Sequence, residues 1–432
     1  MNFNTFYNEK IDEKFLMGTH KSGLRVAIVP KKGFSKYYAI YGTEYGSIDR
    51  EFIALGEKEK TVLPDGVAHF LEHKLFEMAD GTNAFDSFSK TGGNSNAFTS
   101  FNITAYLFSC TDNFYENLDI LLDFVNTPYF TDENVAKEQG IIGQEIKMYE
   151  DDPQWRVFFN MLTAMFRENP VKRDIAGTVE SISEITPELL YKCVNTFYNP
   201  SNMFLVLVGN IDENKIEEYI DKHISSERDT GVVEKFGVNE PKIRAKERIS
   251  QNLSVSTPMF AVGFKEKETG VSGYELLKKE IATEILIELL FGKSSEKYIK
   301  MYESGIIEAS FDGETELEKE YGFTSFGGES KDPEKVYETI RECIEIAKKE
   351  GISDDKIRRI KKAVLSDEIR MYNNVENVGN TYIKSLMKGV NPLDYTKAVE
   401  EIDKEYLENR LNEHFDTENS VLSVVYPLEG EE

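Results

Sequence analysis

The chain has 432 residues, a length that exceeds one ordinary hydrophobic core and predicts two domains or more. Its net charge of -26, from 77 acidic and 51 basic side chains, argues against nucleic acid as a partner because the phosphates would be repelled. No apolar run approaches the roughly 18 to 20 residues that cross a bilayer, and the N-terminus lacks a signal-peptide core. The three cysteines are widely separated, which predicts reduced thiols. We therefore expect a cytoplasmic protein without membrane contact.

Strand and helix patterns alternate along the first half of the chain. Strands are predicted where β-branched and aromatic residues dominate, and helices where apolar residues recur at helical spacing. The predicted strands cover 23–30, 37–46, 96–110 and 201–212, and the predicted helices cover 66–78, 113–126 and 132–152.

The second half repeats this order after a polar stretch. Its predicted strands cover 254–266 and 320–330, and its predicted helices cover 275–292 and 332–349. The sequence QEIKMY at 144–149 returns as DEIRMY at 367–372. This similarity indicates an internal duplication.

We therefore predict an α+β fold of two homologous domains, each an antiparallel sheet covered by helices. The expected boundaries are 1–222 for the first domain, 223–250 for a linker and 251–432 for the second domain.

The chain has five histidines, and two of them, His69 and His73, lie four residues apart in the sequence HFLEH. When the two matching helices are aligned on the sequences KLF and LLF, His69 falls opposite Glu284 and His73 opposite Glu288. A duplication in which one copy keeps the reactive residues is typical of an enzyme with a single site.

The spacing of the two histidines suggests a metal site. Residues i and i+4 of a helix share one face, so His69 and His73 can bind one ion, at about 2.0–2.1 Å from each imidazole nitrogen for zinc. Glu72 borders that face, where a carboxylate can take a proton from water made more acidic by the ion. The alternative is a pair of surface histidines, since five-residue patterns recur by chance.

A catalytic zinc site needs a third protein ligand. Glu138 and Glu145 in the helix EQGIIGQEIKMYE are seven residues apart and project from one side, whereas Glu150 lies on another face. A solvated acidic helix is the alternative interpretation in a chain with 77 acidic residues. The residues alone favour Glu138 or Glu145 and do not separate them.

The HxxEH motif and the downstream sequence KEQGIIGQEIKM together resemble the pitrilysin/insulinase metallopeptidase family. The sequences GGNSNAFTSFNITAYLFS at 92–109 and FYNPSNMFLVLVGNID at 197–212 are also similar to signatures of that family. The resemblance covers the whole chain, most strongly 60–212, and points to the half-size bacterial members related to mitochondrial processing peptidase.

The resemblance implies a role for each matching residue of the site. It makes His69, His73 and Glu145 the ligands of one zinc ion per chain, and Glu72 the general base. Glu138 would not bind the ion itself but would orient one of the ligand histidines.

The resemblance also implies a substrate and a reaction. Asn96, Ala97 and Phe98 match an edge strand to which an extended peptide is added as a further strand. We therefore expect a zinc-dependent endopeptidase that cleaves peptides or unfolded or leader segments. The alternatives are a non-catalytic subunit of a processing-peptidase-like complex, against which the intact motif argues, and a zinc-dependent acid/base enzyme for small molecules, which no feature supports.

A pair of residues expected in the second domain is missing. Active members of the family carry an Arg and a Tyr that hold the substrate and the developing oxyanion. In the sequence IKMYESGIIEASF, alignment on Gly305 puts Met301 and Glu308 at these positions, and Tyr302 is one residue out of register. We therefore expect a heterodimer with a homologous half-size subunit that supplies the pair, and favour it over a homodimer.

Overall fold

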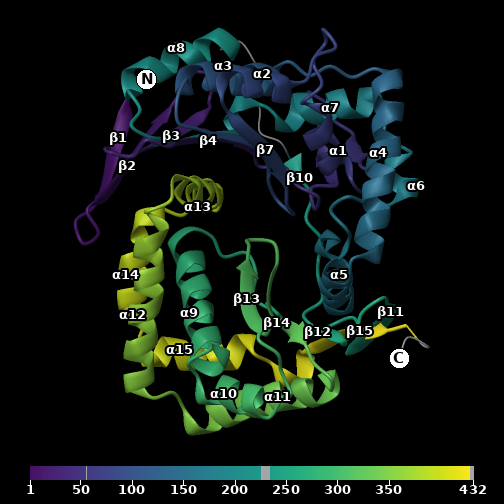
Figure 1. Ribbon diagram of the computed structural model, residues 1–432, viewed down its shortest axis with the longest axis vertical. Coiled ribbons are helices and arrows are strands. Elements are labelled where there is room, and N and C mark those ends of the chain that lie inside the picture. Colours follow the sequence, from purple (N-terminus) through teal and green to yellow (C-terminus); the bar gives the residue numbers. More distant parts are fainter. Residues whose placement is uncertain (55, 225–233, 429–432) are drawn as a thin grey trace. The chain divides into compact units, whose positions relative to one another are not determined.

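The computed structural model describes residues 1–54, 56–224 and 234–428 (Figure 1). Contacts within the chain divide it into two compact units. Unit 1 contains Met1–Ile146, Asp174–Gly237 and Ile369–Met387, and unit 2 contains Lys147–Arg173, Val238–Glu368 and Lys388–Glu432. Among the described residues, no helix is both long and apolar enough to cross a membrane, and the expected cytoplasmic location stays a prediction.

The main sheet of unit 1 has seven strands in the order β1-β2-β3-β9-β4-β8-β7. They are β1 (Phe3–Asn8), β2 (Glu13–Thr19), β3 (Arg25–Pro30), β4 (Tyr37–Thr43), β7 (Asn94–Thr99), β8 (Thr104–Cys110) and β9 (Met203–Gly209). The central strand β9 is buried along its whole length. At one edge, β7 pairs with β8 through one side of its backbone, which leaves the other side without a strand in this sheet.

The sheet of unit 2 has five strands in the order β11-β15-β12-β14-β13. They are β11 (Arg248–Leu253), β12 (Met259–Lys265), β13 (Asp312–Leu317), β14 (Gly322–Glu329) and β15 (Val421–Pro427). The order matches β3-β9-β4-β8-β7 strand for strand when each set is numbered along the chain. The common topology supports the internal duplication.

The fold class expected from the sequence is confirmed, with one difference in strand direction. Each main sheet is antiparallel except for one parallel pair, β3 with β9 and β11 with β15. In the first sheet β9 lies between β3 and β4 and is antiparallel to β4. In the second sheet β15 lies between β11 and β12 and is antiparallel to β12. A strand between two antiparallel neighbours must run parallel to one of them, so this insertion imposes the parallel pair.

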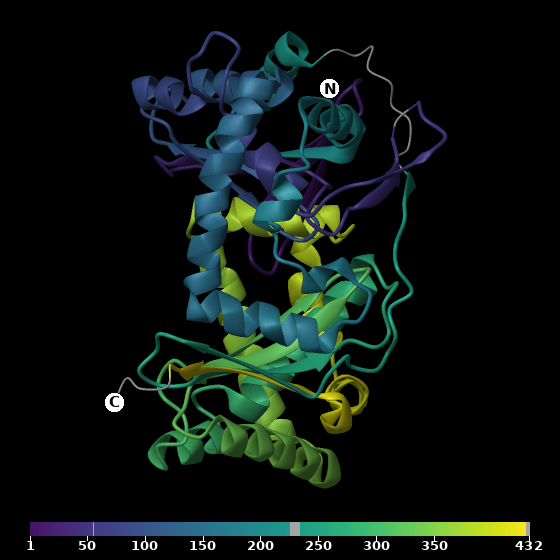
Figure 2. The ribbon, with the colours of Figure 1, turned by 90° about the vertical axis from the view of Figure 1, so that its right-hand side faces the viewer.

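Helices cover the faces of both sheets (Figures 1 and 2). The helices that lie wholly or mainly in unit 1 are α1 (Val67–Lys74), α2 (Ala84–Thr91), α3 (Phe114–Asn126), α4 (Asp132–Asp151), α6 (Val179–Ile182), α7 (Pro187–Phe197), α8 (Glu213–His223) and α13 (Val375–Met387). Those wholly or mainly in unit 2 are α5 (Pro153–Met165), α9 (Gly273–Phe291), α10 (Glu296–Glu303), α11 (Pro333–Glu350), α12 (Asp354–Met371), α14 (Tyr395–Glu401) and α15 (Lys404–His414).

Each half of the chain lends one helix to the sheet of the other half. Helix α5 packs on β12 and β15 of unit 2 (Figure 2), and α13 packs on β4 and β9 of unit 1. Both contacts include a glycine: a Cβ added at Gly263 would lie 2.4 Å from Cε of Met165, and one added at Gly379 would lie 2.3 Å from the ring of Tyr38. The backbones approach closely because these positions lack side chains.

The exchange of helices makes the compact units differ from the continuous ranges expected from the sequence. Periodicity identifies a helix but not the sheet on which it packs, so the sequence does not reveal that 147–173 belongs to unit 2 and 369–387 to unit 1. Of the expected linker 223–250, residues 225–233 lie outside the described residues. The following short strand β10 (Glu234–Lys235) joins β5 (Glu51–Ile53) and β6 (Lys60–Val62) in a small sheet.

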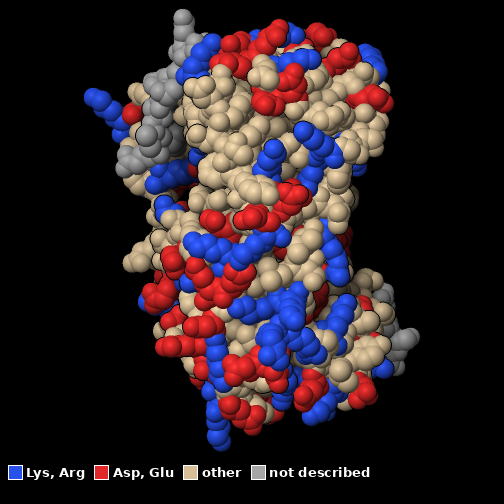
Figure 3. All heavy atoms as spheres, turned by 90° about the vertical axis from the view of Figure 1, so that its left-hand side faces the viewer, with Lys and Arg blue, Asp and Glu red and all other residues tan. Residues whose placement is uncertain are grey.

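Charged side chains of both signs are interspersed over the face of the protein in Figure 3. The acidic excess of the sequence therefore forms no uninterrupted patch on that face. Exposed ion pairs such as Lys60–Glu51 contribute about 1 kcal/mol or less to stability.

Substitution of Gly379 tests the close packing of α13 on the sheet. Gly379→Ala should lower the free energy of unfolding by about 1–3 kcal/mol, because the new methyl group meets the buried ring of Tyr38. Gly140→Ala is the matched control on α4, since an added Cβ there meets nothing within 4 Å and alanine favours the helix by up to about 1 kcal/mol. Thermal unfolding of the two variants checks this, and equal melting temperatures would contradict the packing argument.

Candidate metal centre

Helix α1 (Val67–Lys74) presents the HFLEH sequence. The helix begins after Gly66, whose φ of 93° is left-handed and whose added Cβ would lie 2.5 Å from a backbone carbonyl oxygen; only glycine fits there. Phe70 is fully buried and anchors one face of the helix. The rings of His69 and His73 lie side by side, with centroids 4.6 Å apart.

Glu145 on α4 lies against both imidazole rings. Its Oε1 is 3.7 Å from Nε2 of His69, and its Oε2 is 3.4 Å from Nε2 of His73. Among the described residues, these three form the one group of potential ligands whose atoms lie within 4.8 Å of one another. Ligand atoms around a tetrahedral zinc ion are about 3.3–3.6 Å apart, so the spacing fits this ion.

Glu138 lies on the other side of His73. Its Oε1 is 3.1 Å from Nδ1 of His73, whereas Glu145 faces Nε2. Burial tends to raise the pKa of Glu138, but the hydrogen bond with His73 and the positive charges of His73 and Lys74 lower it overall. Of the two carboxylates that the sequence left open, Glu145 therefore faces Nε2 of both histidines and Glu138 faces Nδ1 of His73.

The two histidines differ in their electrostatic surroundings. Burial and the charge of His73 lower the pKa of His69 to about 4, so its ring is neutral at pH 7 and can offer a lone pair to a metal. Burial acts against the charged form of His73 as well, but its hydrogen bond with Glu138 and the charge of Glu145 raise its pKa. Each ring can bind a metal only in its neutral form, so the raised pKa of His73 opposes metal binding as the pH falls.

Glu72 is held by a residue of the edge strand. Oγ1 of Thr99, the last residue of β7, donates a hydrogen bond of 2.6 Å to Oε2 of Glu72. Burial raises the pKa of Glu72, and this hydrogen bond opposes the rise. Thr99 was not among the candidate residues from the sequence, although it closes the NAFT segment that supplied three of them.

Asn96, Ala97 and Phe98 lie in β7, opposite Leu107, Tyr106 and Ala105 of β8, respectively. The side-chain Oδ1 of Asn96 accepts a hydrogen bond of 2.9 Å from the backbone N–H of Ala97. The arrangement leaves an edge at which a further strand can be added.

The second half carries carboxylates where the first half has histidines. Burial and the charge of Glu280 raise the pKa of Glu284 to about 8, so it is protonated at neutral pH, and it accepts a hydrogen bond of 3.1 Å from Tyr395. Glu284 and Glu288 do not belong to the metal-ligand group found among the described residues. Within the described part of the chain, the potential ligands therefore lie in the first half alone.

The positions aligned with the family's Arg and Tyr hold a buried methionine and an exposed glutamate. Met301 on α10 is 4% exposed and belongs to the hydrophobic core of unit 2. Tyr302 is 49% exposed and stacks on Tyr298, and Glu308 is exposed. Of the aligned side chains, Met301 has no hydrogen to donate and Glu308 would repel an oxyanion.

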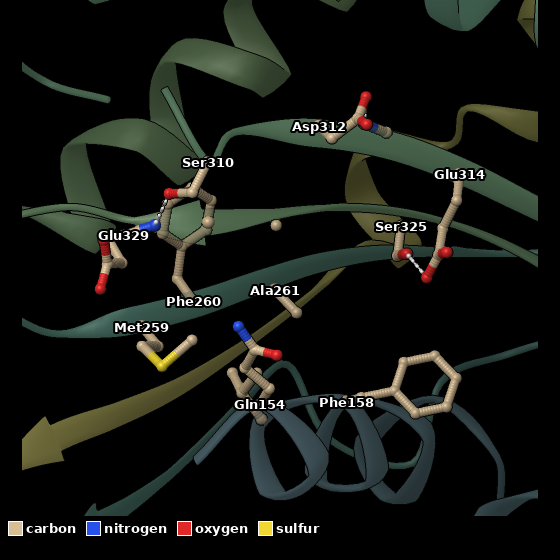
Figure 4. A pocket seen from close by; sticks show the side chains of 14 residues that line it. Gln154, Phe158, Met259, Phe260, Ala261, Ser310, Asp312, Glu314, Ser325 and Glu329 are labelled. Carbon is tan, nitrogen blue, oxygen red and sulfur yellow. Dashed lines mark hydrogen bonds between the residues drawn. The ribbon is translucent and has the colours of Figure 1, made fainter. Parts of the chain in front are cut away.

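A separate pocket of about 350 Å³ lies in unit 2, between α5 and the strands β12, β13 and β14 (Figure 4). Its wall combines apolar side chains such as Phe158 and Met259 with the carboxylates of Asp312, Glu314 and Glu329. Ser325 donates a hydrogen bond of 3.2 Å to Glu314. None of the residues that line it is a histidine or a cysteine, so the pocket lacks the nitrogen and sulfur ligands of a zinc centre.

Comparisons with known families match adjacent parts of the chain. The model described as Insulinase (Peptidase family M16) matches residues 52–179, which include every residue of the candidate centre. The model described as Peptidase M16 inactive domain matches residues 184–364.

Individual proteins match over the whole length. The Uncharacterized zinc protease YmfH of Bacillus subtilis is 40% identical over 98% of this chain and 97% of its own. The crystal structure of an M16-like peptidase from Alicyclobacillus acidocaldarius superposes with a TM-score of 0.92 at 32% identity, covering 99% of each chain. Pitrilysin, at 14% identity and a TM-score of 0.78, shares the fold over 100% of this chain and 47% of its own.

Metal analysis tests the centre directly. The purified chain should bind one zinc ion, and His73→Ala or Glu145→Ala should lose most of this binding because each removes a ligand. Glu138→Ala should weaken zinc binding about 10–100-fold, as the loss of a residue that holds a metal ligand by a hydrogen bond does. Glu150→Ala is the control, since Glu150 is exposed on another face of α4; loss of zinc in this variant, or its retention without Glu145, would contradict the assignment.

Proposed function

Because this chain belongs to the M16 (insulinase) peptidase family, we propose that it is a zinc-dependent endopeptidase that cleaves extended peptides or unfolded segments. The observation that carries the proposal is the contact of Glu145 with Nε2 of both His69 and His73, beside a half-buried Glu72. Metal ligands, a base and a strand edge thus come together in unit 1.

Each side chain of the centre has one task in the proposed reaction. His69, His73 and Glu145 hold the ion, which when bound supplies Lewis acidity for the scissile carbonyl and makes water more acidic. Glu72 takes a proton from the attacking water as its oxygen bonds to the carbonyl carbon. Glu72 then returns that proton to the amine nitrogen as the peptide C–N bond breaks.

The proposed substrate is an extended chain. A peptide added beside β7 would bond to the backbone near Ala97, displacing the contact that Asn96 makes with this amide. Main-chain pairing discriminates weakly between sequences. Thr99 connects this edge to Glu72, so a peptide on the strand would run past the base.

The proposed active form is a heterodimer. The family's Arg and Tyr are replaced by a buried Met301 and an exposed Glu308, so another source of oxyanion donors is needed. A homologous half-size chain without HxxEH would supply them. A homodimer with a different donor is the alternative.

Two other functions would give different results in a peptide-cleavage assay. A non-catalytic assembly subunit would bind partners without peptide cleavage, and a small-molecule enzyme would act on no peptide. The set of potential ligands and the adjacent Glu72 favour the endopeptidase, since neither is needed for assembly.

Replacement of the base separates binding from catalysis. Glu72→Gln should keep zinc but reduce cleavage of an unstructured fluorogenic peptide about 10²–10⁴-fold, because the ligands remain and the proton acceptor is lost. Glu150→Gln is the control with the same loss of charge on an exposed site. Near-normal turnover by the Glu72→Gln enzyme would contradict the mechanism.

Mixing of subunits tests the heterodimer. The zinc-loaded chain alone should cleave an unstructured peptide poorly, and addition of a homologue that carries the Arg/Tyr pair should restore cleavage. A homologue with both residues changed to alanine serves as the control. Full activity of this chain by itself, with zinc bound, rules out the need for a partner.

A further inference from the structure

Lys74 directly follows His73 and is the last residue of α1. Its side chain is completely buried, with 0% exposure. Removal of an ammonium group from water is strongly unfavourable unless charged partners surround it. The partners of Lys74 therefore indicate what its charge does.

The ammonium group of Lys74 lies between two carboxylates. Nζ donates a hydrogen bond to Oε2 of Glu77, three residues further along the chain. It also lies 3.7 Å from Oε2 of Glu138. The other oxygen of Glu138, Oε1, is the atom that contacts Nδ1 of His73 at 3.1 Å.

We propose that Lys74 is a positioning residue of the metal centre, which holds Glu138 in the orientation that fixes the ring of His73. The proposal rests on the zinc site proposed above. Lys74 acts through Glu138 and contacts neither the substrate nor the ion.

A positive charge is needed at this place because carboxylates crowd around it. Glu77 and Glu138 each place an oxygen within ion-pair distance of the same nitrogen, so without Lys74 the two would face each other. An apolar side chain would fill the space but would leave Glu138 without a partner for Oε2 among these contacts. Glu138 would then be free to turn away from His73.

The support of the two histidines is asymmetric. Nδ1 of His69 is buried and has no hydrogen-bond partner among the described residues, whereas Nδ1 of His73 has Glu138. The orientation of His73 is therefore the part of the centre that depends on Lys74.

Two effects of removing Lys74 have opposite signs, and this makes the proposal testable. Loss of a nearby positive charge alone would strengthen the attraction of the centre for zinc. Loss of the orientation of Glu138 would weaken it. Positioning predicts weaker binding, and a purely electrostatic effect predicts tighter binding.

The experiment is a double-mutant cycle read by zinc affinity in competition with a chromophoric chelator. Lys74→Met should bind zinc about 10–100-fold more weakly, as expected for a contact behind a ligand. In the double variant with Glu138→Gln, the loss should equal that of Glu138→Gln alone, because Lys74 acts through Glu138. The visible spectrum of the Co²⁺-loaded Lys74→Met protein should shift in the same direction as that of Glu138→Gln.

Two further variants guard against a change in folding. Lys74→Gln keeps a hydrogen-bond donor for Glu77 but not the charge, and should reproduce the loss of affinity. Lys90→Met changes an exposed lysine at the end of α2 and should leave zinc binding unaltered. Thermal unfolding of the metal-free proteins reports the stability of each variant separately from its zinc affinity.

The outcomes distinguish the two proposals. Absence of zinc binding by the wild-type chain would reject the zinc site itself. If the wild type binds zinc and Lys74→Met and Lys74→Gln bind it as tightly or more tightly, Lys74 is not a positioning residue. Losses that multiply in the double variant would also overturn the proposal, since they would show that Lys74 acts independently of Glu138.

Discussion

The approach of α1 to α4 is the constraint on which the proposed chemistry depends. It brings two imidazoles and the carboxylates of Glu72, Glu138 and Glu145 into one partly buried region. These acidic groups are poorly solvated and repel one another. Lys74 offsets part of that repulsion, and a divalent cation at the proposed centre would offset more. Helix α4 thus contributes two carboxylates to the region. Glu145 lies at Nε2 of His73, and Glu138 lies at Nδ1 of the same ring.

The duplicated halves share a strand order but not a chemistry. Where the first half has His69 and His73, the second has Glu284 and Glu288, and burial together with the charge of Glu280 raises the pKa of Glu284 to about 8. A carboxyl that is neutral at pH 7 attracts a cation far less than an imidazole–carboxylate set does. The second half therefore shares the strand order of the first without its pair of imidazoles.

The pattern predicts fewer than half of the helices and strands, among them β3, β4, β9, β12, β14, α1, α3, α4, α9 and α11, because burial imposes a period of two on these strands and of 3.6 on these helices. The predicted strand 96–110 is two strands, β7 and β8. What the pattern does not contain is which elements meet. The parallel strand pairs, the exchange of helices, and the choice between Glu138 and Glu145 all depend on tertiary contacts. Thr99 and Lys74 were missed for the same reason, since a hydroxyl and an ammonium acquire their roles only from the carboxylates beside them.

The most direct measurement is a crystal structure of the zinc-loaded protein with anomalous data at the zinc absorption edge. The account predicts one anomalous peak per chain, at about 2.0–2.2 Å from Nε2 of His69, Nε2 of His73 and a carboxylate oxygen of Glu145. It also predicts that Glu138 stays on Nδ1 of His73. A zinc ion bound through Nδ1, by Glu138 in place of Glu145, or at the pocket of unit 2 would contradict it.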